Sequence, residues 1–219
     1  MLTVALAKGR TAEDALPLWR EAGVPLPEDM DESRALVFEV PWDGHPPLRY
    51  LLAKPADVPT YVAYGVADIG IVGKDVLLEQ DKEMYELLDL GVARCRLCVA
   101  GLERDRASQP RRVATKYPKL ADRYFRMLGH SVEIVPLSGS IELASVIGLT
   151  DRIFDLVQTG ATLAANGLVV FDEVSDISAR LVANRSSYRM KHDDMLAMVN
   201  RLQVAIEQRG GRANAVGRD

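Results

Sequence analysis

The sequence has 219 residues, of which 48% are hydrophobic and 26% are charged, and its formal net charge is −4. This is the composition of an ordinary globular protein with one large domain or two small ones. No apolar run approaches the roughly 18–20 residues that span a bilayer, and the N-terminus has no secretory signal pattern. We therefore expect a cytoplasmic protein with no membrane partner. Because no long run of lysine or arginine occurs, we also expect no nucleic-acid partner.

In the first part of the chain, strand-like and helix-like patterns alternate. Pro17 predicts that the first helix becomes regular late, with Asp14 as its cap. Asp43 and Gly44 separate two strand-like runs and predict a hairpin. The pattern predicts strands over 2–7, 34–40, 48–53 and 67–72, and helices over 11–22, 57–64 and from 75.

The alternation continues through the rest of the chain. It predicts strands over 92–100, 112–115, 131–137, 154–158, 168–171 and 179–184, and helices over 117–129, 139–147, 162–166 and 187–208. Such alternation favours an α/β fold with largely parallel sheets. In sheets of this kind, ligands bind beyond the carboxyl ends of the strands.

The two cysteines, Cys95 and Cys98, have the spacing of redox pairs and of half a zinc site. The three histidines are scattered along the sequence, and the strand-like flanks would turn the two thiols to opposite faces. We interpret both cysteines as small apolar core residues.

One pattern occurs twice. Residues 67–79 align without a gap on residues 154–166, and the alignment places Gly73 on Gly160. Each copy has an acid, an apolar strand, a glycine turn and a helix start. The repeat favours two similar α/β lobes around a cleft, and chance similarity between two strand–helix units is the alternative.

The repeat suggests a division of the chain. Lobe I covers residues 1–91, lobe II covers residues 92–173, and residues 174–205 return to lobe I and form the longest helix. Residues 206–219 have little apolar surface to bury and predict a disordered tail.

The strand that ends near residue 158 runs into a turn rich in glycine and hydroxyl groups. The turn consists of Thr159, Gly160, Ala161, Thr162 and Leu163. A strand end followed by a glycine and a helix start presents unpaired backbone N–H groups, which suit an anion. We interpret the turn as a phosphate cradle; the alternative is that Thr162 is only a helix N-cap.

Two acids lie near this turn in the sequence. Asp155, in the preceding strand, could accept hydrogen bonds from sugar hydroxyls or be tied to the backbone. Glu142 falls in the first turn of the helix over 139–147, where an acid is often only a capping residue.

Cations follow the strands expected in lobe I. Pairs of cations at a strand end suit a polyphosphate, and a solvated turn is the alternative. The candidates are Lys8, Gly9 and Arg10 after the first strand, Lys54 after the strand over 48–53, Lys74 beside Gly73, and Arg34 at a strand start.

The run "PLSGSIELASVIGLTDRIFDLVQTGATL" resembles the signature of the ATP phosphoribosyltransferases. That signature has a glutamate, a glycine six residues later, and an aspartate before [Ser/Thr]-Gly-x-Thr-Leu. The matching residues are Glu142, Gly148, Asp155, Thr159, Gly160, Thr162 and Leu163. "AKGR", "KPADVP", "ADIGIVGKDVL" and "RVATKYP" resemble other blocks of the family, so the resemblance covers about residues 2–205. Thr150, where a smaller residue is usual, and Lys54, where arginine is common, are departures.

The resemblance implies two lobes like those of a type II periplasmic binding protein and an enzyme of histidine biosynthesis. The family joins N1 of the adenine of ATP to C1 of phosphoribosyl pyrophosphate and releases pyrophosphate, with Mg2+ carried by the pyrophosphate. The resemblance implies that residues 159–163 and Lys54 bind phosphoribosyl pyrophosphate, with residues 159–163 on its 5′-phosphate. It implies that Asp155 and Glu142 are catalytic and hold the ribose. It also implies that the remaining lobe I residues meet pyrophosphate or ATP; these are Lys8, Gly9, Arg10, Arg34 and Lys74.

Because the chain ends soon after the long helix, it resembles the short form of the family. Short-form chains work with a regulatory subunit similar to a histidyl-tRNA synthetase, and we expect a homodimer of the catalytic chain. One alternative is a non-catalytic two-lobed binding protein for a small phosphorylated ligand. A phosphoribosyltransferase of the other fold family is less favoured, because its loop has two adjacent acids upstream whereas Asp155 follows Phe154.

Overall fold

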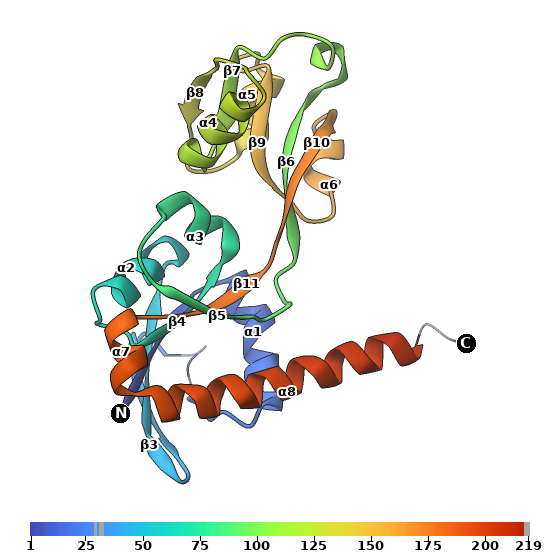
Figure 1. Cartoon of the computed structure of the whole chain (residues 1–219). Helices are drawn as coiled ribbons and strands as arrows, with labels where there is room; N and C mark the ends of the chain where they lie inside the picture. Colours follow the sequence, from blue (N-terminus) through green and yellow to red (C-terminus); the bar gives the residue numbers. More distant parts are fainter. Residues whose placement is uncertain (29, 31–32, 217–219) are drawn as a thin grey trace. The chain divides into compact units, whose positions relative to one another are not determined.

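The computed structural model describes residues 1–28, 30 and 33–216, which form two compact units (Figure 1). Unit 1 comprises Met1–Ala93 and the chain from Ser178 onward, and unit 2 comprises Arg94–Ile177. From the sequence we expect the chain to pass from lobe I to lobe II after residue 91 and to return after residue 173. In the structure it enters unit 2 after residue 93 and returns to unit 1 after residue 177.

The sheet of unit 1 has six strands within the described residues. In spatial order they are β2 (Val37–Trp42), β3 (His45–Ala53), β1 (Leu2–Ala7), β4 (Ile69–Gly73), β11 (Ala179–Ala183) and β5 (Tyr85–Asp89). β3, β1 and β4 run parallel to one another, and the other strands are antiparallel to their neighbours. β2 and β3 form the predicted hairpin, with Trp42 opposite His45 across Asp43 and Gly44.

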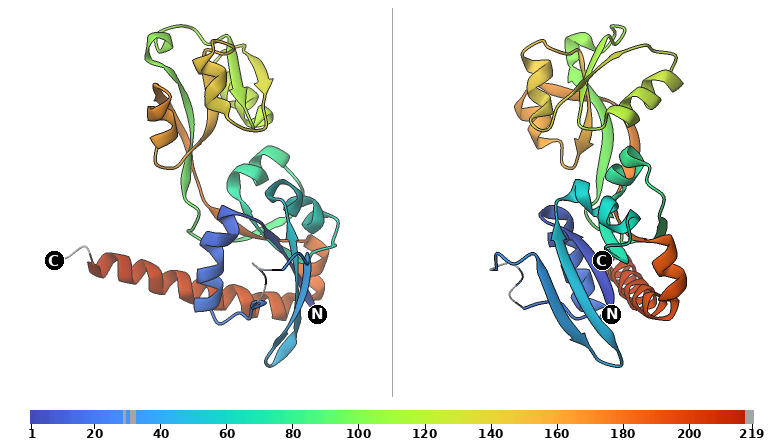
Figure 2. Two further views of the ribbon diagram at one scale, coloured as in Figure 1. Left: turned by 180° about the vertical axis from the view of Figure 1, so that it is seen from behind. Right: turned by 90° about the vertical axis from the view of Figure 1, so that its left-hand side faces the viewer.

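Helices cover both faces of this sheet because its central strands are apolar on both sides. In β1, Leu2, Val4 and Leu6 belong to the same core cluster as buried residues of α1 and α8, whereas Ala5 and Ala7 belong to a cluster with residues of α2. The long α8 runs along the side of unit 1 that carries α1 (Figure 2). The helices are α1 (Arg10–Glu21), the short 3₁₀ turn η1 (Pro55–Asp57), α2 (Val58–Ala63), α3 (Lys74–Gln80), α7 (Arg185–Met190) and α8 (His192–Val216).

Unit 2 has a five-stranded sheet among the described residues. The spatial order is β10 (Leu168–Ile177), β6 (Cys95–Leu102), β9 (Arg152–Val157), β7 (Arg112–Thr115) and β8 (Glu133–Pro136). Its helices are η2 (Glu103–Asp105), α4 (Pro118–Met127), α5 (Ile141–Val146) and α6 (Ala161–Ala165). Buried residues of α5 and α6 share a core cluster with Ile153 and Val157 of β9, while Phe125 of α4 lies 6.5 Å from Phe154, ring centre to ring centre.

Both sheets are mixed, so the prediction of largely parallel sheets is wrong. A parallel pair needs a long crossover, usually a helix. Here β10 and β11 are separated by one residue, Ser178, and β6 follows β5 without a helix between them. Strands joined in this way need not run parallel to their neighbours.

The predicted repeat is confirmed in the topology of the two units. The order β3-β1-β4-β11-β5 in unit 1 corresponds to β8-β7-β9-β6-β10 in unit 2. In each series the first three strands are parallel and the last two pairings are antiparallel. β4 and β9, the strands of the two aligned sequence segments, occupy the same place in their sheets.

Several predicted element bounds are wrong. α1 begins at Arg10, with Gly9 as N-cap, and contains Pro17, so Asp14 is not its cap; burial of Leu18 and Trp19 maintains the helix despite the backbone hydrogen bond that proline cannot make. The helix predicted over 187–208 is two helices, α7 and α8, separated at Lys191.

Two further segments differ from prediction. β5 was not anticipated from the sequence, and the predicted disordered tail is helical as far as Val216, with residues 217–219 lying outside the described residues. Although α8 is long, no helix in the described chain combines the length and apolar character needed to cross a bilayer.

Candidate active site

In unit 2, three parallel strands bring the loops that follow them to one edge of the sheet. Thr115 at the end of β7 lies opposite Pro136 of β8 and Phe154 of β9. The Thr115 hydroxyl donates to the Phe154 carbonyl (2.6 Å) and accepts from the Tyr117 amide (2.8 Å), which fixes the end of β7 against β9. The predicted phosphate turn, the start of α5 and the loop after β7 therefore share this edge.

The turn after β9 leaves most of its backbone donors unpaired. Gly160 has φ 79° and ψ 0°, a left-handed conformation that suits glycine. The amides of Thr159, Gly160, Thr162 and Leu163 donate to no acceptor among the described residues, and the Ala161 amide makes only a 3.3 Å contact with the Thr159 hydroxyl. Unpaired amides pointing out of a tight bend form an anion-binding concavity.

The remaining features of the turn keep it open to solvent. Leu163 is 5% exposed and anchors the turn in the core, whereas Thr159, Ala161 and Thr162 are exposed. The N-cap of α6 is Gly160, and no side chain caps the helix, so the interpretation of Thr162 as an N-cap is wrong. α6 has only five residues, so the amides contribute more to anion binding than a helix dipole can.

Asp155 lies on β9 one residue beyond Phe154. Ile153 and Val157, two residues before and two after it, pack against α5 and α6. Residues two apart on a strand share a face, so the Asp155 side chain lies on the face of the sheet that carries those helices. One carboxylate oxygen accepts the Leu156 amide at 2.8 Å, and the residue is partly exposed. This bond ties the carboxylate to the backbone of its own strand.

Glu142 is in the first turn of α5, partly exposed, on the same face of the sheet as Asp155. The N-cap of α5 is Ser140, which has φ 48° and ψ 49° and makes no side-chain cap. A left-handed conformation at a residue with a Cβ is strained, and such residues cluster at functional sites. β8, which precedes α5, is two strands from β9, about 10 Å away at ordinary strand spacing.

Lys116 is a residue that the sequence analysis missed. It directly follows β7, the strand between β8 and β9, and its side chain is exposed. It makes no salt bridge with any described residue. The rule that identified Lys8, a cation immediately after a parallel strand, would also have identified Lys116.

Unit 1 places Lys8 and Lys54 side by side. β1 and β3 are parallel with Ala7 opposite Ala53, so the residues that follow them are neighbours, and the Lys8 amide donates to the Ala53 carbonyl at 2.8 Å. Gly9, with φ 88° and ψ −156°, is the N-cap of α1, and no side chain caps this helix. The edge therefore offers two cations and uncapped helix amides.

Two more predicted cations are exposed near this edge. Arg10 is the first residue of α1. The Leu52 amide donates to the Leu36 carbonyl at 2.8 Å, so the segment that contains Arg34 lies beside the end of β3. Within the described part of the chain, Lys8, Arg10, Arg34 and Lys54 form no salt bridge.

Lys74 differs from these cations. Its Nζ lies 2.5 Å from Oε2 of Glu86, and its amide donates to the Ser178 carbonyl at 3.0 Å. The side chain links the start of α3 to β5. Its charge is already balanced by Glu86, so Lys74 is the weakest candidate of the predicted set.

Two other sequence features have structural explanations. Cys98 is 1% exposed, and burial raises the pKa of its thiol, as expected for a core residue rather than a reactive thiol. Asp68, the counterpart of Asp155 in the repeat, is 4% exposed, accepts the Thr3 amide at 2.7 Å and pairs with Lys191 at 2.6 Å. Asp68 therefore stabilises unit 1 instead of facing a ligand.

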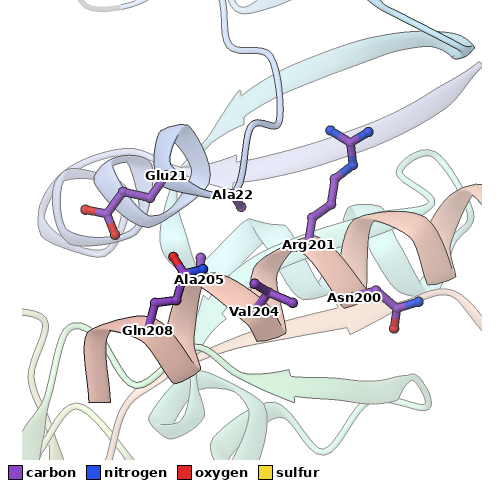
Figure 3. Close-up of a pocket in the computed structure, with 7 residues that line it drawn as sticks. All are labelled: Glu21, Ala22, Asn200, Arg201, Val204, Ala205 and Gln208. Atoms are coloured by element: carbon purple, nitrogen blue, oxygen red, sulfur yellow. The ribbon is translucent and has the colours of Figure 1, made fainter. Parts of the chain in front are cut away.

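A pocket of about 310 Å³ lies between the end of α1 and α8 (Figure 3). Glu21 and Arg201 are among the residues that line it, and no predicted site residue does. It is therefore separate from the edge that carries Lys8 and Lys54.

Comparison with known proteins identifies a family. Residues 54–204 match the family described as HisG: ATP phosphoribosyltransferase. The ATP phosphoribosyltransferase of Geobacillus sp. (strain WCH70) is 52% identical over 209 residues, covering 95% of this chain and 100% of its own. That of Bacillus subtilis (strain 168) is 51% identical over 208 residues, covering 94% and 96%.

Solved structures agree with this result. The ATP phosphoribosyl transferase (HisG:HisZ) complex from Thermotoga maritima matches with a TM-score of 0.79 and 34% identity, over 95% of this chain and 100% of that one. The periplasmic aliphatic sulphonate binding protein SsuA from Escherichia coli matches with a TM-score of 0.58 over 99% and 72%, but at 12% identity this supports only the periplasmic-binding-protein-like fold. The chain belongs to the ATP phosphoribosyltransferase family.

Proposed function

We propose that residues 159–163 bind the 5′-phosphate of phosphoribosyl pyrophosphate in the reaction of this enzyme, an ATP phosphoribosyltransferase of histidine biosynthesis. The observation that carries the proposal is the set of unpaired amides at Thr159, Gly160, Thr162 and Leu163. Amide donors recognise a phosphate without a change of protonation, and the two threonine hydroxyls add further donors.

Asp155 and Glu142 then face the ribose. The reaction forms a bond from N1 of the adenine to C1 of the ribose and breaks the bond from C1 to the pyrophosphate oxygen. As that bond weakens, positive charge develops at C1 and the ring oxygen, and carboxylates on the same face stabilise it electrostatically. The neutral N1 already carries a lone pair, so positioning of the two substrates replaces the need for a strong base.

Lys8, Arg10 and Lys54, with the backbone at Gly9, meet pyrophosphate or the phosphates of ATP. Their support is that they are exposed and make no salt bridge with a described residue. Arg34 lies beside the same strand end. Lys116, at the edge of the unit 2 sheet, is an additional candidate for the donor's phosphates.

Magnesium fits this scheme as an ion that arrives with the pyrophosphate. The described residues contain no group of three or more His, Cys, Asp or Glu side chains placed to hold a metal. Mg2+ typically keeps several waters and binds through one or two carboxylates plus substrate phosphates. When bound it neutralises the leaving pyrophosphate, and Asp155 is the side chain that could contribute an oxygen.

A regulatory subunit is part of the proposal. The Thermotoga maritima protein, 34% identical to this chain, is described as a HisG:HisZ complex. We infer that this chain is a short-form catalytic subunit that works as a homodimer with a histidyl-tRNA-synthetase-like partner. Co-purification of the two chains, with their stoichiometry measured by light scattering, tests this inference.

The decisive experiment mixes the purified chain with ATP, phosphoribosyl pyrophosphate and Mg2+, with and without the regulatory subunit, and follows the ultraviolet absorbance of phosphoribosyl-ATP. We expect product only when both substrates are present, with one pyrophosphate released per product. Binding of both substrates without product in either condition would favour the alternative of a non-catalytic binding protein.

A further inference from the structure

Unit 2 contains a cavity of about 400 Å³ at the edge of the sheet where β7 and β9 begin. The phosphate turn follows the other end of β9, so the cavity and the turn lie at opposite ends of the same strands. The residues that line it come from η2, the loop before β7 and the turn after α5. They include Arg104, Arg111, Arg112, Ser145, Thr150 and Asp151.

The backbone around this cavity is held in place by two side chains. Arg152 is 4% exposed and donates to the carbonyls of Asp105 (2.6 Å) and Ser108 (2.8 Å). The carboxylate of Asp151 accepts the amides of Arg111 and Arg112, each at 2.8 Å. The loop on one side and the start of β7 on the other are thus fixed before any ligand binds.

Two hydroxyl groups beside the cavity lack partners. Ser145 is 2% exposed and Thr150 is 4% exposed, and neither hydroxyl makes a hydrogen bond with a described residue. A buried hydroxyl without a partner is unfavourable. Both residues line the cavity, so a ligand there is the nearest source of partners for these hydroxyls. Thr150 is also the position where the sequence departs from the smaller residue usual in the family.

The charge around the cavity is positive. Arg111 and Arg112 form no salt bridge within the described chain, and the Nε of Arg104 is 3.9 Å from Asp105. The Asp151 carboxylate is engaged by two backbone amides. Arginine recognises phosphate through paired N–H donors.

We propose that this cavity binds a phosphate group, either free phosphate or a small phosphate monoester. The hydroxyls of Ser145 and Thr150 hydrogen-bond its oxygens, and Arg111 and Arg112 at the rim balance its charge. The site is separate from the donor's phosphate turn, so the chain has two phosphate sites at opposite edges of one sheet.

The test is a titration of the ¹⁵N-labelled full-length chain with inorganic phosphate at constant ionic strength, observed by NMR. We expect saturable shifts of the amides of Ser145, Thr150 and Arg112, in addition to shifts in residues 159–163. A second titration with glycerol 3-phosphate distinguishes the sources, because tighter binding identifies a monoester and equal or weaker binding identifies free phosphate.

Matched variants locate the site. The double variant Ser145→Ala/Thr150→Val should lose at least tenfold in phosphate affinity at the cavity and keep the shifts at 159–163, whereas Thr162→Val should do the reverse. Arg112→Gln should weaken binding several-fold, and Arg126→Gln, which removes a surface arginine paired with Asp122, should not. Shifts confined to 159–163, equal shifts with chloride, or cavity shifts that persist in the double variant would each overturn the proposal.

Discussion

At residue 160 the backbone takes a left-handed conformation, and the space around a Cβ built there is almost empty, the nearest atom being a Val157 methyl at 4.0 Å. Lack of space inside the protein therefore does not explain the glycine. The conformation exposes the neighbouring amides, and a side chain at 160 would occupy the volume in front of them.

We expect Gly160→Val to raise the KM for phosphoribosyl pyrophosphate about tenfold or more, which corresponds to about 1.4 kcal/mol of lost donor affinity. The reason is steric obstruction of the phosphate together with strain at a positive φ. Steady-state kinetics and calorimetric binding measure the effect.

Gly129→Val is the matched control, because Gly129 has φ +78° and open space but lies between α4 and β8, at the other edge of the sheet. Gly129→Val should lower the free energy of unfolding by about as much as Gly160→Val and leave the KM for phosphoribosyl pyrophosphate unchanged. Normal donor affinity in a folded Gly160→Val protein would show that the phosphate assignment is incorrect.

Asp155 carries the second prediction at this scale. Asp155→Asn keeps the shape of the side chain and removes its charge, so we expect kcat to fall about 10²-fold, the size of effect that loss of one electrostatic contact in an active site produces. Thermal unfolding should show that the fold is retained. Asp122→Asn, on the exposed face of α4, is the control, and unchanged turnover in Asp155→Asn would remove Asp155 from the site.

At the scale of single elements, the boundary between β11 and α7 depends on Asn184. Its Oδ1 accepts the amides of Ser186 and Ser187, both at 3.0 Å, which is an ordinary N-cap. Its Nδ2 donates to the carbonyls of Val62 (2.9 Å) and Ala63 (3.2 Å) at the end of α2. One side chain thus begins one helix and satisfies the end of another.

We predict that Asn184→Ala lowers the free energy of unfolding by about 1–2 kcal/mol for the lost cap. The free energy should fall further because the carbonyls of Val62 and Ala63 lose their hydrogen-bond donor. Asn184→Asp keeps the acceptor and loses the donor, so it should fall between wild type and alanine. Urea unfolding of the three proteins measures this order. Equal stability of the aspartate and alanine variants would mean that the cap contributes little.

The elements also show where sequence patterns succeed. β1 and β7 were predicted with their observed bounds, because an apolar run between turn residues is a strong signal. β5 was missed because its residues 85–89, "YELLD", alternate weakly and pair only with β11, which is almost a hundred residues away in the sequence. The sequence pattern does not predict the break at Lys191, where the side chain pairs with Asp68, 123 residues away in the sequence.

At the scale of the whole molecule, the two units have separate cores and separate candidate ligand groups. If Lys8 meets the phosphates of ATP and not the donor's pyrophosphate, variants at Lys8 and in the phosphate turn of unit 2 should change different Michaelis constants. Lys8→Gln should raise the KM for ATP roughly tenfold, because a hydrogen bond to a charged group contributes about 1.5 kcal/mol or more. The KM for phosphoribosyl pyrophosphate should stay the same.

Lys82→Gln makes the same chemical change elsewhere in unit 1, where Lys82 donates to the Thr60 hydroxyl, and should leave both constants unchanged. Initial rates measured over a grid of both substrate concentrations separate the effects. An equal rise in both constants for Lys8→Gln would contradict the assignment of ATP to unit 1.

The sequence by itself determined the family, the alternation of strands and helices, the repeat, and the glycine turn at 159–163, because these depend on short-range patterns of residue type. Only the tertiary structure decided that both sheets are mixed, that Lys74 is neutralised by Glu86 while Lys8 and Lys54 are left together, and that Asp68 is a buried structural partner of Lys191. The physical reason is that strand direction and ion pairing depend on which distant segments become neighbours, and local sequence does not encode that directly.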